Sequence, residues 1–192
     1  MKIHLNRTIL VLCFAGWAQA AESDLPPGRQ IAFPDPAMSP AAISKLLLEG
    51  AGATVDVSAI SDKPVMMDAK QLSFWRTLEW LAEATESRVV TTAGKISLKP
   101  GKSLSPSHIA GPFRFAAREV LIRGDPDAGR SNYTVVLDVT WEPSVLAYRI
   151  DGVPKISMAK DESGKAIEIS GGGSRVLTAG NSACLLYTSD AA

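Results

Sequence analysis

The chain has 192 residues, with 20 lysines and arginines against 20 aspartates and glutamates, and so carries no formal net charge. This balance, without any block of basic residues, argues against nucleic acid as a partner. Two cysteines and two histidines are too few for a disulfide framework or for a zinc site built on thiolates, and we expect no cofactor and no metal.

The first 20 residues are typical of an export signal. Lys2 and Arg7 make the start positive, residues 8–17 are apolar, and Ala18-Gln19-Ala20 has the small-x-small pattern of a cleavage site. We predict cleavage after Ala20, a periplasmic or secreted protein, and no membrane span in the mature chain, since no later run approaches the length that a transmembrane helix needs. An uncleaved anchor and a lipid anchor on Cys13 are the alternatives.

The other end of the chain has an unusual composition. Residues 184–192, CLLYTSDAA, resemble the translation of a common sequencing adapter, and Leu185 and Leu186 follow a glycine-rich stretch. We therefore expect no strand or helix there, and a native chain that continues beyond Ala183. Without this tail and the signal, roughly 160 residues remain, enough for one ordinary domain or two small ones.

Residues 21–36 are predicted to be a linker, because they hold four prolines and no apolar periodicity. A helix is then predicted from Ser39, a good N-cap, with Pro40 at the first helical position. Gly50 and Gly52 provide its end, because glycine tolerates the left-handed conformation of a C-cap. Its apolar face comprises Ile43, Leu46 and Leu47.

The stretch from residue 53 to residue 99 is predicted to contain a second helix among short strands. Strands are expected at residues 53–58 and 65–67, with a turn at 61–64 between them. The second helix follows Ser73, which is a candidate cap. At about 100° per residue, its apolar residues fall in one arc. These are Phe74, Trp75, Leu78, Leu81, Ala82 and Thr85, with Arg76, Glu79, Glu83 and Glu86 on the opposite side and Thr77, Trp80 and Ala84 on a flank.

A hairpin is predicted next, with strands at residues 88–92 and 95–99 around Ala93-Gly94. Val90 is expected to face the helices, and Ile96 and Leu98 to share that face. The order helix, strand, strand, helix, strand, strand favours an α+β fold for residues 37–100, with two helices on one face of a small sheet.

The pair of short β-α-β repeats over residues 39–99, ending in a strand with Gly94, Ile96 and Leu98, resembles the short N-terminal domain of secretins and of signalling TonB-dependent receptors. The resemblance covers about a third of the chain and rests on apolar patterns. It implies a periplasmic protein-contact module, and nothing in the sequence supports the large pores or receptors to which such domains belong.

Residues 101–112 are predicted to be a second linker, rich in proline, glycine and serine. From Phe113 onward only strands are predicted, and the clearest alternation runs from Tyr133 to Trp141 through Val135, Leu137 and Val139. Later strands are expected near residues 146–150, 156–158 and 167–169, so residues 113–183 favour an antiparallel β-sandwich that lacks its last strands.

The run VTWEPS followed by the hairpin KDESGK resembles a module of uncharacterised exported proteins from planctomycete-type bacteria. In those proteins the module often follows a small α+β domain, so this resemblance spans nearly the whole mature chain. It implies export and carries no activity.

No set of residues predicts catalysis. His108 is the only histidine of the mature chain and lies in the predicted linker, where a solvated side chain is the simpler interpretation. Asp125 with Asp127, and Asp161 with Glu162, lack the spacing of a calcium loop and are typical of turns. The glycines of Gly171-Gly172-Gly173-Ser174 precede no helix and no Lys-Ser/Thr pair, so we expect a loop rather than a phosphate cradle.

The tryptophans give the remaining candidates. Trp75 and Trp141 lie at core positions of their predicted elements, whereas Trp80, on the flank, is a candidate contact with a partner or with the second domain. Three hypotheses follow: a non-enzymatic module that binds protein or peptide through a sheet edge or Trp80; a protein that binds carbohydrate or surface polymer; and a fragment of an enzyme whose active residues lie in a missing C-terminus.

Overall fold

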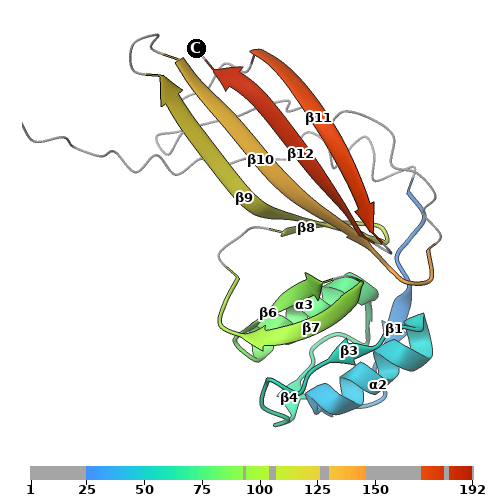
Figure 1. Ribbon diagram of the computed structural model, residues 1–192. Coiled ribbons are helices and arrows are strands. Elements are labelled where there is room, and N and C mark those ends of the chain that lie inside the picture. The colour runs from blue at the N-terminus through green and yellow to red at the C-terminus, as the bar shows by residue number, and fades with distance from the viewer. Residues whose placement is uncertain are drawn as a thin grey trace, which may run out of the picture.

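A computed structural model describes residues 25–92, 94–103, 107–125, 130–145, 170–179 and 182–191. Two helices and several short strands form the N-terminal part, and a long antiparallel sheet follows (Figure 1). The predicted α+β class is confirmed. The export signal lies outside the described residues, and in the described part no helix is long and apolar enough to cross a membrane.

Helix α2 (Pro40–Ala51) begins and ends as predicted. Ser39 caps it, with its Oγ accepting a hydrogen bond from the Ala42 N–H at 3.3 Å. Gly52 ends it at φ +68°, a left-handed conformation that glycine adopts without steric cost, and its N–H donates to the Leu48 carbonyl at 2.9 Å. Its apolar face is buried at Ile43 and Leu47.

Helix α3 (Phe74–Ala84) is held at its start by a strand that the sequence did not predict. Ser73 is the N-cap residue, but its side chain makes no capping bond. The first helical N–H, of Phe74, donates instead to the Arg29 carbonyl at 2.9 Å. Strand β1 (Gln30–Ala32) continues from Arg29 and pairs antiparallel with β5 (Gln71–Ser73), so the linker prediction is wrong for these residues.

The predicted hairpin is confirmed as β6 (Ser87–Thr92) and β7 (Lys95–Pro100), and β3 (Val55–Asp56) joins β7 in parallel. The expected face of Val90 is wrong. Paired residues of an antiparallel ladder share a face, and Val89 lies opposite the buried Leu98, whereas Val90 lies opposite Ser97. The register therefore turns Val89 toward the core.

A second short ladder joins β2 (Ala37–Met38) to β4 (Val65–Met66). The main core lies between the two helices and these strands. Its buried residues are Ile31, Ile43, Leu47, Ala51, Ala53, Val55, Phe74, Trp75, Leu78, Leu81, Ala82, Ile96 and Leu98. Every apolar residue of the predicted α3 arc from Phe74 to Ala82 belongs to this set, which confirms the helical periodicity as the signal that orients α3.

The C-terminal sheet has the strand order β11-β12-β10-β9-β8, with every neighbouring pair antiparallel. Its strands are β8 (Ser107–Ala110), β9 (Phe113–Asp125), β10 (Arg130–Trp141), β11 (Ser170–Ala179) and β12 (Ser182–Ala191). The alternation predicted on β10 is confirmed, because Val135, Leu137, Val139 and Trp141 are buried together. Residues 146–169, which hold the other predicted strands and the KDESGK turn, lie outside the described residues, so a second layer stays a prediction.

Three expectations about irregular segments are wrong. Residues 107–110 of the second predicted linker form β8. The glycines of residues 171–173 lie within β11, where a register shift between Ser170 and Gly173 interrupts the ladder. Leu185 lies opposite Leu137 within β12. Strands pair through main-chain groups, which every non-proline residue carries, so low side-chain periodicity did not exclude them.

Candidate functional site

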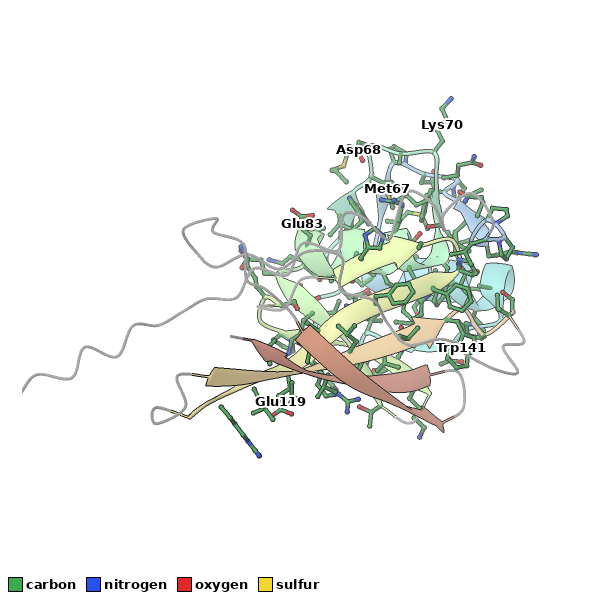
Figure 2. All side chains as sticks on the ribbon, turned by 90° about the horizontal axis from the view of Figure 1, so that it is seen from above. Met67, Asp68, Lys70, Glu83, Glu119 and Trp141 are labelled. Carbon is green, nitrogen blue, oxygen red and sulfur yellow. The ribbon has the colours of Figure 1, made fainter. Side chains whose placement is uncertain are left out.

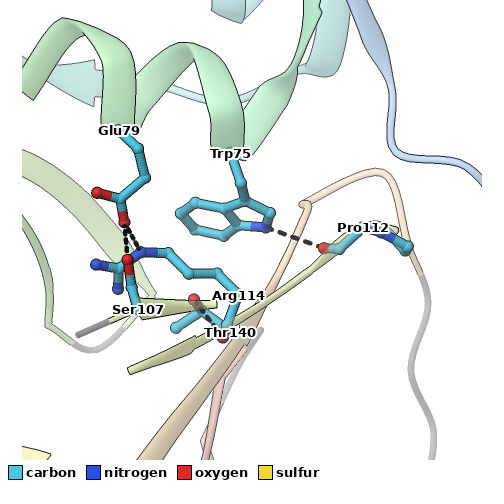
Figure 3. A network of polar contacts seen from close by, with 6 residues as sticks. All are labelled: Trp75, Glu79, Ser107, Pro112, Arg114 and Thr140. Carbon is cyan, nitrogen blue, oxygen red and sulfur yellow. Dashed lines mark hydrogen bonds and ion pairs between the residues drawn. The ribbon is translucent and has the colours of Figure 1, made fainter. Parts of the chain in front are cut away.

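The two parts of the chain meet where α3 faces the turn between β8 and β9. Trp75 is fully buried, and its indole Nε1–H donates to the Pro112 carbonyl at 2.9 Å (Figure 3). The same carbonyl accepts the Glu142 N–H at 3.0 Å. One carbonyl thus joins the helix to the end of β10, and Trp75 has a polar contact in addition to the core packing that the sequence predicted.

An ion pair lies beside this tryptophan. The Arg114 Nε–H donates to Glu79 Oε1 at 2.6 Å, and the Ser107 hydroxyl donates to the same oxygen at 2.8 Å (Figure 3). The Arg114 side chain is 8% exposed and that of Glu79 is 30% exposed. The interaction is therefore screened less by water than a surface pair, and it orders Glu79, which helical periodicity placed on the polar side of α3.

A buried carboxylate forms the third contact. Glu142 is 1% exposed, and its two oxygens accept the Arg29 N–H at 2.8 and 3.1 Å. Burial raises the pKa of this carboxyl above its ordinary value, while the Arg29 N–H and the Arg29 charge act in the opposite direction. The Arg29 guanidinium donates in turn to the Gly50 carbonyl at 2.8 Å, so it links the segment before β1 to the end of α2.

Two glycines allow the backbones to approach at this contact. A Cβ on Gly28 would lie 2.8 Å from Glu142 Oε1, and one on Gly111 would lie 2.5 Å from the Pro26 carbonyl oxygen. Gly111 also has φ +53°, which favours glycine. We name these contacts of Trp75, Glu79 and Glu142 the junction. It fixes the sheet to the helical part, where the sequence predicted a linker between separate domains.

Beyond the junction, β9 leaves part of its length unpaired on one side. β8 pairs only with its first four residues, from Phe113 to Ala116. Among the described residues no strand pairs with residues 117–125 on that side, and we name this segment the β9 outer edge. It contains two of the exposed large apolar residues of the described chain, Val120 at 39% and Leu121 at 40%.

The outer edge begins at a β-bulge. Ala117 lies opposite Leu137 and Glu119 lies opposite Val136, so Arg118 is an extra residue in β9. The Arg118 guanidinium reaches across to Asp138 on β10, with its Nε–H donating at 2.9 Å. Bulges and charged side chains at sheet edges limit unwanted strand pairing. The β9 outer edge therefore combines features that restrict pairing, the bulge and Arg118, with exposed apolar residues that could contact a partner strand.

The predicted candidate residues do not converge on one site. Trp80 is half-buried and packs against the N-terminal core, and Trp75 and Trp141 are in core positions as predicted. His108 is exposed on β8 rather than in a linker. Figure 2 shows Met67, Asp68 and Lys70 at the border of the N-terminal part away from the sheet, and Glu119 on the side of the sheet.

The acids considered for calcium gain no support. Asp125 ends β9, and Asp127, Asp161 and Glu162 lie outside the described residues. Within the described ranges, no three histidine, cysteine or acidic residues gather to hold a metal ion.

Sequence reasoning missed the polar side of the junction. Arg114 follows the alternation of β9 as a polar residue, and Glu142 directly follows the predicted strand of β10, yet both are buried. Neither position differs in pattern from an ordinary exposed charge. Their partners, Glu79 and Arg29, are 35 and 113 residues away, so only tertiary structure brings them together.

Comparisons of this chain with protein-family models, with curated proteins and with solved structures found no match. The arrangement of the junction and of the β9 outer edge is therefore the basis for the function proposed below.

Proposed function

We propose that this protein is a non-enzymatic interaction module that takes up an extended segment of a protein partner along the β9 outer edge. The carrying observation is that residues 117–125 have no neighbouring strand on one side among the described residues, while β10 pairs with them on the other. Outward N–H and C=O groups of such an edge bond readily to an added strand.

The side chains of the edge offer selectivity to such a partner. Successive residues of a strand point to opposite faces, so Val120 and Leu121 present apolar contacts on both faces. Two exposed residues of opposite charge flank Leu121: Glu119 lies two residues before it, and Arg123 lies two residues after it. A partner strand would be chosen by apolar residues at its centre and by charges of matching sign around them.

Two expectations from the sequence support this function. Residues 1–20 predict export, and residues 39–99 resemble domains that contact other proteins in the periplasm. We therefore propose a partner in the periplasm or outside the cell. Trp80, half-buried against the core, remains a proposed second contact, and the carbohydrate-binding and enzyme-fragment hypotheses gain no specific observation.

Capture of partners from a periplasmic extract tests this function when it is combined with amide hydrogen exchange. The bait is the mature chain, and the matched bait carries Leu121→Lys, at an exposed position on the face of the sheet opposite to the Val135 cluster. We expect a captured protein to protect the amides of residues 117–125 and to be recovered poorly by the variant. Equal recovery by both baits, or protection confined to other segments, would refute the edge as the binding site. A Trp80→Phe bait tests the second contact in the same way.

A further inference from the structure

We infer that the strand which adds to the β9 outer edge is β9 of a second copy of this chain, so that the protein forms a two-fold dimer through a continuous sheet. This inference rests on the function proposed above, because it names the partner of the same edge. The argument comes from the order of charges along the edge and from its length.

The edge is complementary to itself in one antiparallel register. If Leu121 lies opposite the partner's Leu121, then Glu119 lies opposite the partner's Arg123, and Arg123 lies opposite the partner's Glu119. The two-fold axis repeats every pair, so the dimer gains two opposite-charge pairs around an apolar centre. Directly opposite residues of this kind contact each other in antiparallel sheets, and opposite charges stabilise the pair.

The same register continues the faces of the sheet. Val120 lies opposite the partner's Ile122, on the side of the sheet that carries the buried Val135 of β10. Arg118, which already pairs with Asp138, lies opposite the partner's Gly124, so the partner places no like charge directly opposite it. Each face of one sheet therefore extends into the same face of the other.

Neighbouring registers lose these matches. Moving the partner by one residue in one direction places Arg118 opposite the partner's Arg123, and moving it by one residue in the other places Val120 opposite that arginine. A one-residue shift also joins opposite faces of the two sheets. Parallel pairing in register places like charges beside each other. The observed order of charges thus favours antiparallel pairing centred on Leu121.

The β9 outer edge is long enough to pair with the same segment of a second copy. In the Leu121 register, the partner's Asp125 lies opposite Ala117, and β8 begins with Ser107 opposite Ala116. β8 and the partner strand would therefore occupy consecutive parts of the same side of β9 without overlapping. The open segment, residues 117–125, spans about 30 Å at the usual rise of a strand.

Charge exchange at the edge tests the inference in solution. Sedimentation velocity over a range of concentrations should show the mature chain passing from monomer to dimer. Glu119→Arg alone and Arg123→Glu alone each place like charges opposite each other twice per dimer, and we expect each to raise the dimer Kd about tenfold or more. The double variant restores opposite charges and should recover the original Kd. Glu83→Arg, an exposed change of the same charge on α3, should leave the Kd unchanged.

Cross-linking tests the register. Under mild oxidation, Leu121→Cys should give a disulfide-linked dimer, because each new thiol lies directly opposite its copy. Arg123→Cys should not, because the two copies of residue 123 are four positions apart, about 13 Å. The mature parent chain, which retains Cys184, sets the background. Cross-linking of both variants to the same extent would overturn the register.

The two proposals fail in different ways. The dimer inference is overturned if the chain stays monomeric at all concentrations, or if the dimer Kd of the double variant is as high as those of the single variants. If a foreign partner nevertheless protects residues 117–125 from hydrogen exchange, the function proposed for the edge stands. A dimer that leaves these amides unprotected places the contact elsewhere and overturns the inference.

Discussion

Replacing Glu142 by glutamine should make the protein more stable at neutral pH than the original chain. Glu142 is 1% exposed, and burial raises the pKa of its carboxyl above the ordinary 4.5. The buried site therefore disfavours the ionised form. Glutamine has the same shape and keeps an oxygen to accept the Arg29 N–H, so Glu142→Gln removes the charge and retains the contact.

The direction of the pH dependence follows from linkage. Below pH 4.5 the carboxyl is protonated in both the folded and the unfolded chain, so the difference between the two proteins is constant there. As the pH rises toward the folded pKa, the unfolded chain ionises first. The original protein then loses about 1.4 kcal/mol of unfolding free energy per pH unit relative to the variant. Above the folded pKa the difference is constant again, and the variant is the more stable protein.

Thermal unfolding of both proteins between pH 3 and pH 8 measures this difference. A loss of 1.4 kcal/mol corresponds to a Tm lower by about 3–6 °C in a chain of this size. Glu83→Gln, which removes a charge from an exposed position on α3, controls for net charge. A variant whose Tm falls further below that of the original protein as the pH rises would show that the site favours the ionised carboxylate, and would refute the argument from burial.

Two further changes test the junction by urea unfolding. Gly111→Ala should lower the free energy of unfolding by about 2–4 kcal/mol, because the residue has φ +53° and the new Cβ would lie 2.5 Å from a backbone oxygen. Gly52→Ala, with φ +68° and no atom within 4 Å of the new Cβ, should lower it by about 1 kcal/mol. Equal losses would mean that the close approach at Gly111 is unimportant. Glu79→Ala should lower the free energy of unfolding by about 2–3 kcal/mol, since it leaves the buried guanidinium of Arg114 without its carboxylate. Glu83→Ala, on the same helix, should change this free energy by less than about 0.5 kcal/mol. Similar values for both variants would show that the ion pair adds no stability.

Local patterns predicted the elements whose signals are short in sequence. Ser39 and Gly52 marked both ends of α2, and the apolar arc from Phe74 to Ala82 oriented α3. Alternation from Val135 to Trp141 predicted the buried side of β10. In each case the physical cause lies within a few residues: a side chain that caps a helix, a glycine with positive φ, or a periodicity that matches the backbone.

Local patterns could not predict β1 and β8, the two strands that lie within predicted linkers. Ile31 is 3% exposed, but the run Ile31-Ala32-Phe33 between two prolines is too short to show a periodicity. β1 exists because its backbone pairs with β5, about 40 residues further along the chain. Val90 shows a related problem: alternation identifies two faces in β6, and only the register against Leu98 decides which one meets the helices.

The junction could not be predicted for an electrostatic reason. A charged residue in an alternating strand is normally solvated, and burying one is costly unless a partner is in place. Arg114 and Glu142 are buried because Glu79 and the Arg29 N–H, from distant segments, meet them. The sequence contains both halves of each contact, but no pattern relates them.

The junction holds the same strand, β9, that carries the β9 outer edge. β9 starts at the turn where Pro112 accepts the Trp75 N–H, and its second residue, Arg114, is fixed by Glu79. The bulge at Arg118 marks the start of the outer edge, directly after this anchored beginning. Ordering an edge strand costs conformational entropy at the moment of binding, and a strand already held at one end and along β10 has lost most of that freedom before a partner arrives. The buried contacts of the junction would therefore lower the entropy cost of the strand pairing that we propose for the residues from Glu119 to Arg123.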